Sequence, residues 1–246
     1  MGSDSNINLS KLYHVGCRRG EVGRYVLLPG DPGRVPMIAK LLDNAKEVAH
    51  NREYLTYTGT LLGEKVSVTS TGMGCPSTAI AVEELAIAGA DTFIRVGTSG
   101  PMQDFIETGD LLIAWGAIRD EYTSKQYMPP EYPAVADLEV TLALRQAARN
   151  RNVRHHVGIT QSKDSFYGQH EPERMPIARQ LQDRWQAWIA GGTICSEMEA
   201  STIFVITRIL NCRSGGIMTS GHDLTHLLVT AIDGLKILIK QDIARR

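Results

Sequence analysis

Short apolar runs alternate along this chain with longer stretches in which apolar residues recur at helical spacing. Such alternation is typical of a mostly parallel sheet flanked by helices. The short runs predict strands at residues 25–28, 66–70, 92–96, 111–115, 157–161 and 215–219. The longer stretches predict helices at residues 35–42, 77–88, 138–150, 175–189, 198–210 and 228–243.

The connections between these elements indicate a single domain. We find no linker rich in Ser or Gly, no internal repeat and no low-complexity tract. Residues 119–137 carry three prolines and predict a long surface loop, which in a compact domain is often functional.

Composition narrows the class of protein but not its chemistry. The 246 residues are 43% hydrophobic and 22% charged, and the 26 basic residues nearly balance the 27 acidic ones. The formal net charge of -1 argues against a nucleic-acid partner. No segment has the length and apolar character of a membrane span or of a signal peptide. The four scattered cysteines favour a reducing, cytoplasmic compartment.

Three turns that contain glycine follow predicted strands, where open α/β sheets bind ligands. The one at residues 71–74 (TGMG) is expected to serve close packing or backbone approach, and the other two offer chemistry. The turn at residues 29–34 (PGDPGR) lets backbone N–H groups approach an anion, and Arg34 adds a cation; an ordinary turn explains it equally well. Arg95 lies inside the apolar strand of the second segment, FIRVGTSG at residues 93–100, so its burial requires an anion or an internal salt bridge. Neither turn is a dinucleotide or Walker motif.

Three further segments allow a structural and a functional interpretation. Arg52 and Glu53 alone predict a surface ion pair. The segment CSEME at residues 195–199 opens an apolar helix, so its carboxylates either cap the helix or bind vicinal hydroxyl groups. The segment DSFYGQH at residues 164–170 either anchors a loop or stacks on and hydrogen-bonds a heterocycle.

Taken together, these motifs resemble the hexameric type of nucleoside phosphorylase, from about residue 13 to residue 217. The matching segments are GDPGR at 30–34, NRE at 51–53, STGMGCPSTAIAVEEL at 70–85, IRVGTSG at 94–100 and SEMEAS at 196–201. YPAVAD at 132–137 and DSFYGQ at 164–169 point to the uridine branch of that family rather than the purine branch. The resemblance implies a three-layer α/β/α fold with a mixed, mostly parallel central sheet. It also implies a catalytic domain at residues 13–246 after an N-terminal tail at residues 1–12.

The resemblance implies a role for individual residues. Those expected to hold inorganic phosphate are Gly30, Arg34, Arg95, Thr98 and, from a neighbouring subunit, Arg52. Those expected to contact ribose are Met198, Glu199 and, from the neighbouring subunit, His14. Phe166 and Gln169 are expected to stack on and hydrogen-bond the base.

The resemblance also implies that phosphate is a co-substrate and that no cofactor is required. A structural potassium ion between subunits would be held by Glu53, Ser77 and the Met73 carbonyl. Because the site is shared, the protein would be at least a dimer, and the family expectation is a trimer of dimers.

Two departures from the family pattern stand out. The usual Gln-x-Arg at the base site is replaced by Gln169-His170-Glu171, so either His170 or Arg174 supplies the missing cation, and we favour Arg174. After Gly215, the flap that usually closes over the base is shortened. Asp223 lies near the position of the general acid of purine-type relatives but out of register, and we assign it no role.

The sequence therefore predicts phosphorolysis of uridine, deoxyuridine or thymidine to the free base and a pentose 1-phosphate. A purine nucleoside phosphorylase on the same scaffold is the first alternative. A nucleosidase is disfavoured by the three arginines, Arg34, Arg52 and Arg95. A nucleoside-binding protein of low activity is compatible with the shortened flap.

Overall fold

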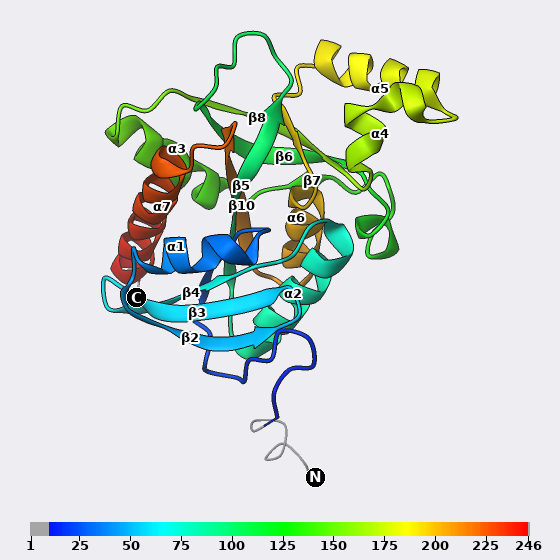
Figure 1. Ribbon diagram of the computed structural model, residues 1–246. Helices are drawn as coiled ribbons and strands as arrows, with labels where there is room; N and C mark the ends of the chain where they lie inside the picture. Colours follow the sequence, from blue (N-terminus) through cyan, green and yellow to red (C-terminus); the bar gives the residue numbers. More distant parts are fainter. Residues whose placement is uncertain (1–9, 246) are drawn as a thin grey trace.

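The apolar runs form one mixed sheet with helices on both of its faces (Figure 1), in a computed structural model that describes residues 10–245. The strands are β1 (Tyr25–Leu28), β2 (Asp43–Asn51), β3 (Tyr54–Leu61), β4 (Glu64–Thr69), β5 (Thr92–Pro101), β6 (Leu111–Asp120), β7 (Ala134–Val135), β8 (His155–Lys163), β9 (Cys195–Glu197) and β10 (Arg213–Ser220). The helices are α1 (Val35–Ala39), α2 (Cys75–Ala88), α3 (Leu138–Asn150), α4 (Phe166–His170), α5 (Ala178–Ala190), α6 (Ala200–Ile209) and α7 (Thr225–Ala244). Short 3-10 helices lie at Pro32–Arg34, Ser124–Gln126 and Pro172–Arg174.

The sheet order is β10-β6-β8-β9-β5-β1-β4-β3-β2, with β7 beside β6. Strand β5 also pairs with β10, so β5, β10, β6, β8 and β9 close into a ring. Parallel pairings join β1 to β4 and β5, β5 to β10, and β8 to β6 and β9, while the other pairings are antiparallel. The ring gathers the ends of β5, β8 and β9 at one place.

The two faces of the sheet bury separate apolar cores, which confirms the predicted three-layer arrangement. Successive residues of a strand point to opposite faces. Leu27 and Ile94 pack with residues of α1, α3 and α7, whereas Leu28 and Phe93 pack with residues of α2 and α6. A side chain buried in this way stabilises the fold by roughly 1.5–3 kcal/mol.

The predicted helices occur, with shifted ends. Helix α3 has the predicted bounds because the Asp137 carboxylate accepts hydrogen bonds from the backbone N–H groups of Glu139 and Val140 at its start. Helix α6 begins at Ala200 rather than at residue 198, because Cys195–Glu197 pairs with β8 and β5 as strand β9.

Three of the strands that the pattern did not predict, β2, β7 and β9, are polar or short. Strand β2 lies at the sheet edge and is largely exposed, so its residues form no apolar run. The segment 119–137, predicted as a loop, contains the end of β6, a 3-10 turn and β7. Arg119 holds it by donating hydrogen bonds to the carbonyl groups of Met128, Pro129 and Tyr132.

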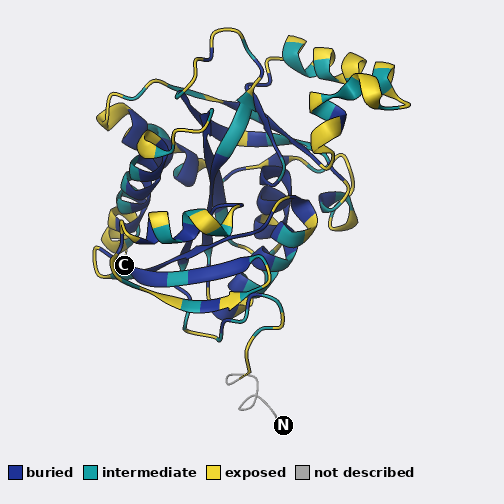
Figure 2. Ribbon diagram, viewed as in Figure 1, coloured by how far each residue is buried: buried dark blue, intermediate teal, exposed yellow. Residues whose placement is uncertain are grey.

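Two regions at the margins of the fold differ in exposure. Of the predicted tail at residues 1–12, residues 1–9 lie outside the described residues, and Leu12 packs against a core. Helix α5 projects from the body of the molecule, and every one of its residues is at least partly exposed (Figures 1 and 2). Among residues 10–245, no helix combines the length and the apolar character that crossing a bilayer needs.

Candidate active site

A cavity of about 470 Å³ lies where the ends of β5, β8 and β9 meet α4 and the segment after β10. It brings together residues that the sequence assigned to phosphate, ribose and base. The predicted site residues that line it are Met73, Arg95, Thr98, Phe166, His170, Met198 and Glu199. Lys163, Ser196, Glu197, Gly221 and His222 also line it.

Arg95 is buried at one end of this cavity between two carboxylates. Its Nη2 donates to Glu199 Oε2 at 2.5 Å, and its Nε lies 3.5 Å from Glu197 Oε2. Gly97 makes room for it, because a Cβ there would lie 2.7 Å from the guanidinium carbon. Burial raises the pKa of Glu197, and the charge of Glu199 raises it further. The internal salt bridge that the sequence left open therefore exists, and it faces a cavity.

Arg34 places a second guanidinium near Arg95, although it is not among the residues that line the cavity. Its side chain is mostly buried, with Nε 3.9 Å from Asp31 Oδ2. Burial lowers the pKa of Arg34, and the nearby charge of Arg95 contributes to the lowering, whereas Asp31 opposes it. Gly30 lies beside them, because a Cβ on it would be 3.7 Å from Arg95 Nη1. The two positive charges repel each other, and an anion bound beside them would stabilise both.

The two carboxylates of the CSEME segment have different tasks. Glu197 Oε2 accepts from the backbone N–H groups of Glu199 and Ala200 at 2.8 and 2.9 Å, so it caps the start of α6. Glu199 Oε1 accepts from the Gly74 N–H at 2.7 Å and is fixed between Gly74 and Arg95. Capping is thus the role of Glu197, and Glu199 with Met198 faces the cavity.

Two aromatic rings from α4 also line the cavity. Phe166 and His170 are one turn apart on α4, and their ring centroids lie 4.2 Å apart. Burial lowers the pKa of His170, and the positive charge of Lys163 lowers it further. The lowered pKa favours the neutral imidazole of His170 over its cationic form.

Arg174, which the sequence favours as the missing cation, is not among the residues that line the cavity. Its side chain is 57% exposed, and its Nε lies 2.6 Å from Glu171 Oε2. Its guanidinium packs over the ring of Tyr167 at 5.3 Å from the centroid. Arg174 is thus occupied on the outer side of α4.

Lys163 is a cation that the sequence analysis missed. It ends β8, is only 5% exposed, and donates from Nζ to Ser196 Oγ at 2.7 Å. Burial lowers the pKa of this ammonium group, against the opposing charges of Glu197 and Glu199. Like Arg95, Lys163 is a cation in a buried strand, but it lies two residues beyond the end of the predicted strand 157–161.

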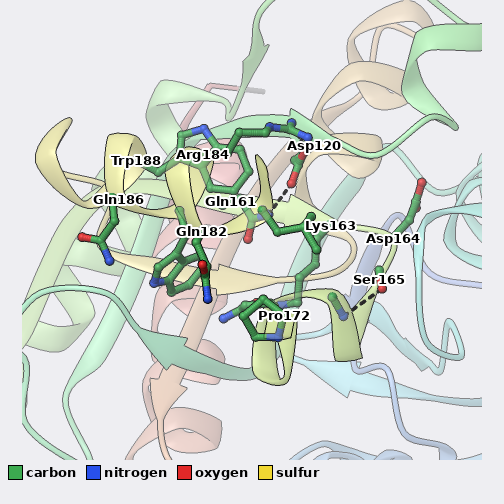
Figure 3. A pocket seen from close by; sticks show the side chains of 14 residues that line it. Asp120, Gln161, Lys163, Asp164, Ser165, Pro172, Gln182, Arg184, Gln186 and Trp188 are labelled. Carbon is green, nitrogen blue, oxygen red and sulfur yellow. Dashed lines mark hydrogen bonds and ion pairs between the residues drawn. The ribbon is translucent and has the colours of Figure 1, made fainter. Parts of the chain in front are cut away.

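A second cavity of about 250 Å³ adjoins the first and shares Lys163 with it (Figure 3). Gln169, predicted to bind the base, lines this second cavity, and its Oε1 lies 2.8 Å from Ser196 Oγ. Because Ser196 lines the first cavity, Gln169 stands at the wall between the two.

His14 and Arg52 lie together at the N-terminal edge of the fold rather than at the cavity. Glu84 fixes His14, accepting from its backbone N–H and lying 2.6 Å from its Nδ1. The Asn51 side chain donates to the His14 carbonyl at 2.7 Å. The Arg52 guanidinium packs over the Tyr13 ring at 5.9 Å. The His14 side chain is 30% exposed, and Nδ1 is the ring nitrogen that Glu84 holds.

The three residues predicted to hold a monovalent cation gather around the Gly72 turn. A Cβ on Gly72 would lie 2.9 Å from Glu53 Cγ and 3.1 Å from Ser77 Oγ. The Ser77 hydroxyl lies 3.4 Å from the Met73 carbonyl oxygen. Carboxylate, hydroxyl and carbonyl oxygens are suitable ligands for a hard cation.

The segment after β10 is as short as the sequence indicates. Gly221 and His222 line the cavity, and α7 begins at Thr225. Asp223 accepts from the Thr225 backbone N–H at 2.9 Å, and this hydrogen bond lowers the pKa of its carboxyl group. An ionised carboxylate that caps a helix is not a general acid for the base.

Comparison with known proteins decides the family. Residues 24–231 match the family described as the phosphorylase superfamily. The chain belongs to the phosphorylase superfamily. A uridine phosphorylase from Treponema pallidum is 48% identical over 248 residues, which cover 95% of this chain and 96% of that protein.

Two other superfamily relatives differ in the base that their names give. A uridine phosphorylase from Thermococcus kodakarensis is 56% identical over 209 residues, which cover 82% of this chain and 74% of that protein. A guanosine phosphorylase from Halorubrum lacusprofundi is 40% identical over 211 residues, which cover 86% of this chain and 83% of that protein. Membership of this superfamily agrees with the cations that meet at one end of the cavity.

Proposed function

We propose that this protein transfers the ribosyl group of uridine to inorganic phosphate, which releases uracil and ribose 1-phosphate. The observation that carries the proposal is the set of side chains that the cavity brings together. Arg95 and Glu199 line it with Arg34 close to both, and Phe166 and Lys163 line it too. The two relatives with the highest identities given above are named uridine phosphorylases.

Phosphorolysis needs a nucleophile held close to C1′ of the sugar while the bond to the base breaks. Arg34, Arg95, Thr98 and the backbone at Gly30 would bind phosphate and orient it toward C1′. Glu199 would accept hydrogen bonds from the ribose hydroxyls, and Met198 would pack against the sugar. No covalent intermediate and no cofactor is required, because positioning and electrostatic stabilisation supply the catalysis.

The departing base needs stabilisation as negative charge develops on it. Phe166 would stack on the pyrimidine. Lys163 would donate to a carbonyl oxygen of the base, in place of the arginine that this chain lacks. Gln169 is close enough to the same site to hydrogen-bond the base, since Ser196 links it to Lys163.

We also propose that the active site is completed by a second copy of this chain. His14 and Arg52 belong to the phosphate and ribose sites by resemblance, yet they lie away from this subunit's cavity. Met73, which lines the cavity, is 85% exposed, and Tyr13 is 76% exposed, so apolar surface lies open near both regions. A dimer with shared sites, assembled further as a trimer of dimers, would cover these side chains.

Three subordinate proposals accompany this function. A potassium ion held by Glu53, Ser77 and the Met73 carbonyl would brace the Gly72 turn. The reducing cytoplasm is the compartment that suits four cysteines, all of which are free thiols. The reaction would serve recovery of pyrimidine bases and pentose from nucleosides.

One experiment tests the central proposal. The protein is incubated with uridine, thymidine, guanosine or inosine, each with and without phosphate, and free base and pentose 1-phosphate are measured. We expect rapid release of uracil only with phosphate. Base release without phosphate would identify a nucleosidase, faster release of guanine would identify a purine enzyme, and no release from any nucleoside would refute catalysis.

A further inference from the structure

The Ser196 hydroxyl group connects Lys163 to two glutamines that line the second cavity, Gln161 and Gln169. Lys163 Nζ donates to Ser196 Oγ at 2.7 Å. The same oxygen lies 2.5 Å from Gln161 Oε1 and 2.8 Å from Gln169 Oε1. A serine hydroxyl has one proton and two lone pairs, so it cannot donate to both amide oxygens.

Gln161 is the amide whose orientation is fixed. It is 1% exposed, and its Nε2 donates to Asp120 Oδ2 at 2.8 Å (Figure 3). Asp120 is in turn paired with Arg184 of α5. Since the Gln161 amide nitrogen faces a carboxylate, its oxygen must face Ser196, and the serine proton goes to Gln161.

This assignment determines how Gln169 is turned. Ser196 has given its only proton to Gln161 and accepts one hydrogen bond from Lys163, so its remaining lone pair needs a donor. The two ends of an amide are assigned from the hydrogen-bond network, and here Nε2 of Gln169 must face Ser196. Its Oε1 is then available to a ligand, as are the remaining N–H groups of Lys163, for which residues 10–245 provide no other acceptor.

We propose that Asp120 and Gln161 are positioning residues that set, through the Ser196 hydroxyl, the hydrogen-bonding pattern that the base meets. Gln169 presents an acceptor and Lys163 presents donors. This pair complements a base edge with a ring N–H beside a carbonyl group, and it opposes an edge with a bare ring nitrogen beside an amino group.

The proposal rests on the function proposed above and narrows it to a substrate class, the oxo bases. Uracil and guanine both carry a ring N–H beside a carbonyl group, whereas cytosine and adenine carry the opposite pattern. The bases named in the three relatives, uracil and guanine, both belong to the first class.

The test removes the group that orients Gln161. In Asp120→Leu, the Gln161 amide is free to turn its nitrogen toward Ser196, which redirects the serine proton to Gln169 Oε1. Gln169 then offers Nε2 to the base. We expect the ratio of the affinities for uracil and cytosine to fall about tenfold or more, measured by calorimetry with phosphate present. The reason is that uracil loses a buried hydrogen bond to Gln169, while cytosine is relieved of a repulsion there.

Three further variants separate this role from a structural one. Gln161→Leu also frees the serine proton and should lower the same ratio, even if Asp120→Leu does not fold. Asp120→Asn keeps an oxygen that accepts the hydrogen bond from Gln161 and should show the wild-type ratio. Gln182 is an exposed residue of α5 that lines the second cavity, as Asp120 and Gln161 do, but it is not part of the hydrogen-bond network of Ser196 described above. Gln182→Leu should therefore leave the ratio unchanged.

The kinetic readout distinguishes the possible results. We expect KM for uridine to rise in Asp120→Leu and Gln161→Leu, with KM for phosphate unchanged. A uniform loss of kcat or of thermal stability with an unaltered uracil-to-cytosine ratio would overturn the positioning role while leaving the proposed phosphorolysis intact. If the wild-type protein neither cleaves uridine nor binds uracil, both the proposed function and this inference fail.

Discussion

Arg95 shows how one residue serves both the fold and the site. Removing its charge would leave Glu197 and Glu199 buried without a cation, and loss of one partner of a buried ion pair costs about 3–5 kcal/mol. The same guanidinium faces the cavity next to Arg34. A useful variant must therefore keep the charge while removing the hydrogen-bonding geometry.

Arg95→Lys meets that requirement, because an ammonium group keeps a positive charge but lacks the planar fork of donors. We expect kcat/KM for phosphate to fall on the order of 100-fold, as when one preorganised donor to the transition state is lost. Arg208→Lys, on the exposed side of α6, is the control and should behave as wild type. Steady-state kinetics with varied phosphate and a thermal melt check the effect, and unaltered phosphate kinetics in a folded Arg95→Lys would contradict the phosphate role.

The buried ammonium of Lys163 makes a prediction about pH. Because burial lowers its pKa, it loses its proton at a lower pH than an ordinary lysine. We expect kcat/KM for uridine to decline on the alkaline side as Lys163 deprotonates, and Lys163→Arg to move that decline to higher pH. The pH profile of the wild type and of Lys163→Arg measures this, and coincident alkaline limbs would exclude Lys163 as the base-site cation.

The contribution of Lys163 to stability should rise with pH over the range in which its contribution to activity declines. The folded state binds the Lys163 proton less tightly than the unfolded state does. Between the lowered pKa and the ordinary value of 10.5, the unfolded state therefore holds more protons, and this residue's contribution to the free energy of unfolding rises with pH.

At the scale of elements, close packing of β10 against α3 positions the strand that leads into the cavity. Gly215 makes this approach feasible, because a Cβ on it would lie 2.5 Å from Val140 Cγ1 of α3. Asp137 fixes the start of the same helix. The short connection from β10 to α7 then places Gly221 and His222 at the site without a longer flap.

Gly215→Ala should therefore destabilise the protein by about 1–3 kcal/mol, the usual effect of overpacking a core. Val140→Ala removes the atoms that would clash, so the double variant should lose less stability than the sum of the two single variants. Denaturant unfolding of the wild type, both single variants and the double variant gives the coupling energy. Additive losses would show that the two residues do not compete for the same space.

At the scale of the whole molecule, the predicted site residues fall into two groups on one subunit. Arg34, Arg95, Thr98, Met198 and Glu199 gather at or beside the cavity, while His14 and Arg52 lie on another part of the surface. Under the shared-site proposal, the second group would act on the site of another copy. This division predicts a specific behaviour of mixed assemblies.

Arg52→Ala and Arg95→Lys should each be nearly inactive alone, yet active together when they are co-expressed. In a mixed dimer one site carries both changes and the other is intact, so random pairing should give about a quarter of the wild-type activity. The control is a mixture of the separately purified variants, assayed before their subunits have had time to exchange. Sedimentation as a fully active monomer, or no recovery on co-expression, would refute the shared site.

Sequence pattern predicted the elements whose own residues carry the signal. Helix α3 has an N-cap and a clear apolar face, and its bounds were predicted to the residue. Strand β2 was missed because an exposed edge strand needs no apolar run, and β9 was assigned to a helix start because its pairing partners lie far away in sequence. Arg95 was found from its improbable place in an apolar strand, whereas Lys163 lay just beyond a predicted strand end.

The sequence by itself determined the family, the layered fold and seven of the residues that line the cavity, because motifs and hydrophobic periodicity are local properties of the chain. Only the tertiary structure decided that Glu197 caps a helix while Glu199 is fixed between Gly74 and Arg95, and that Lys163 rather than Arg174 lines the cavity. These outcomes depend on burial and on distances between groups that are remote in sequence. Both quantities exist only after the chain has folded.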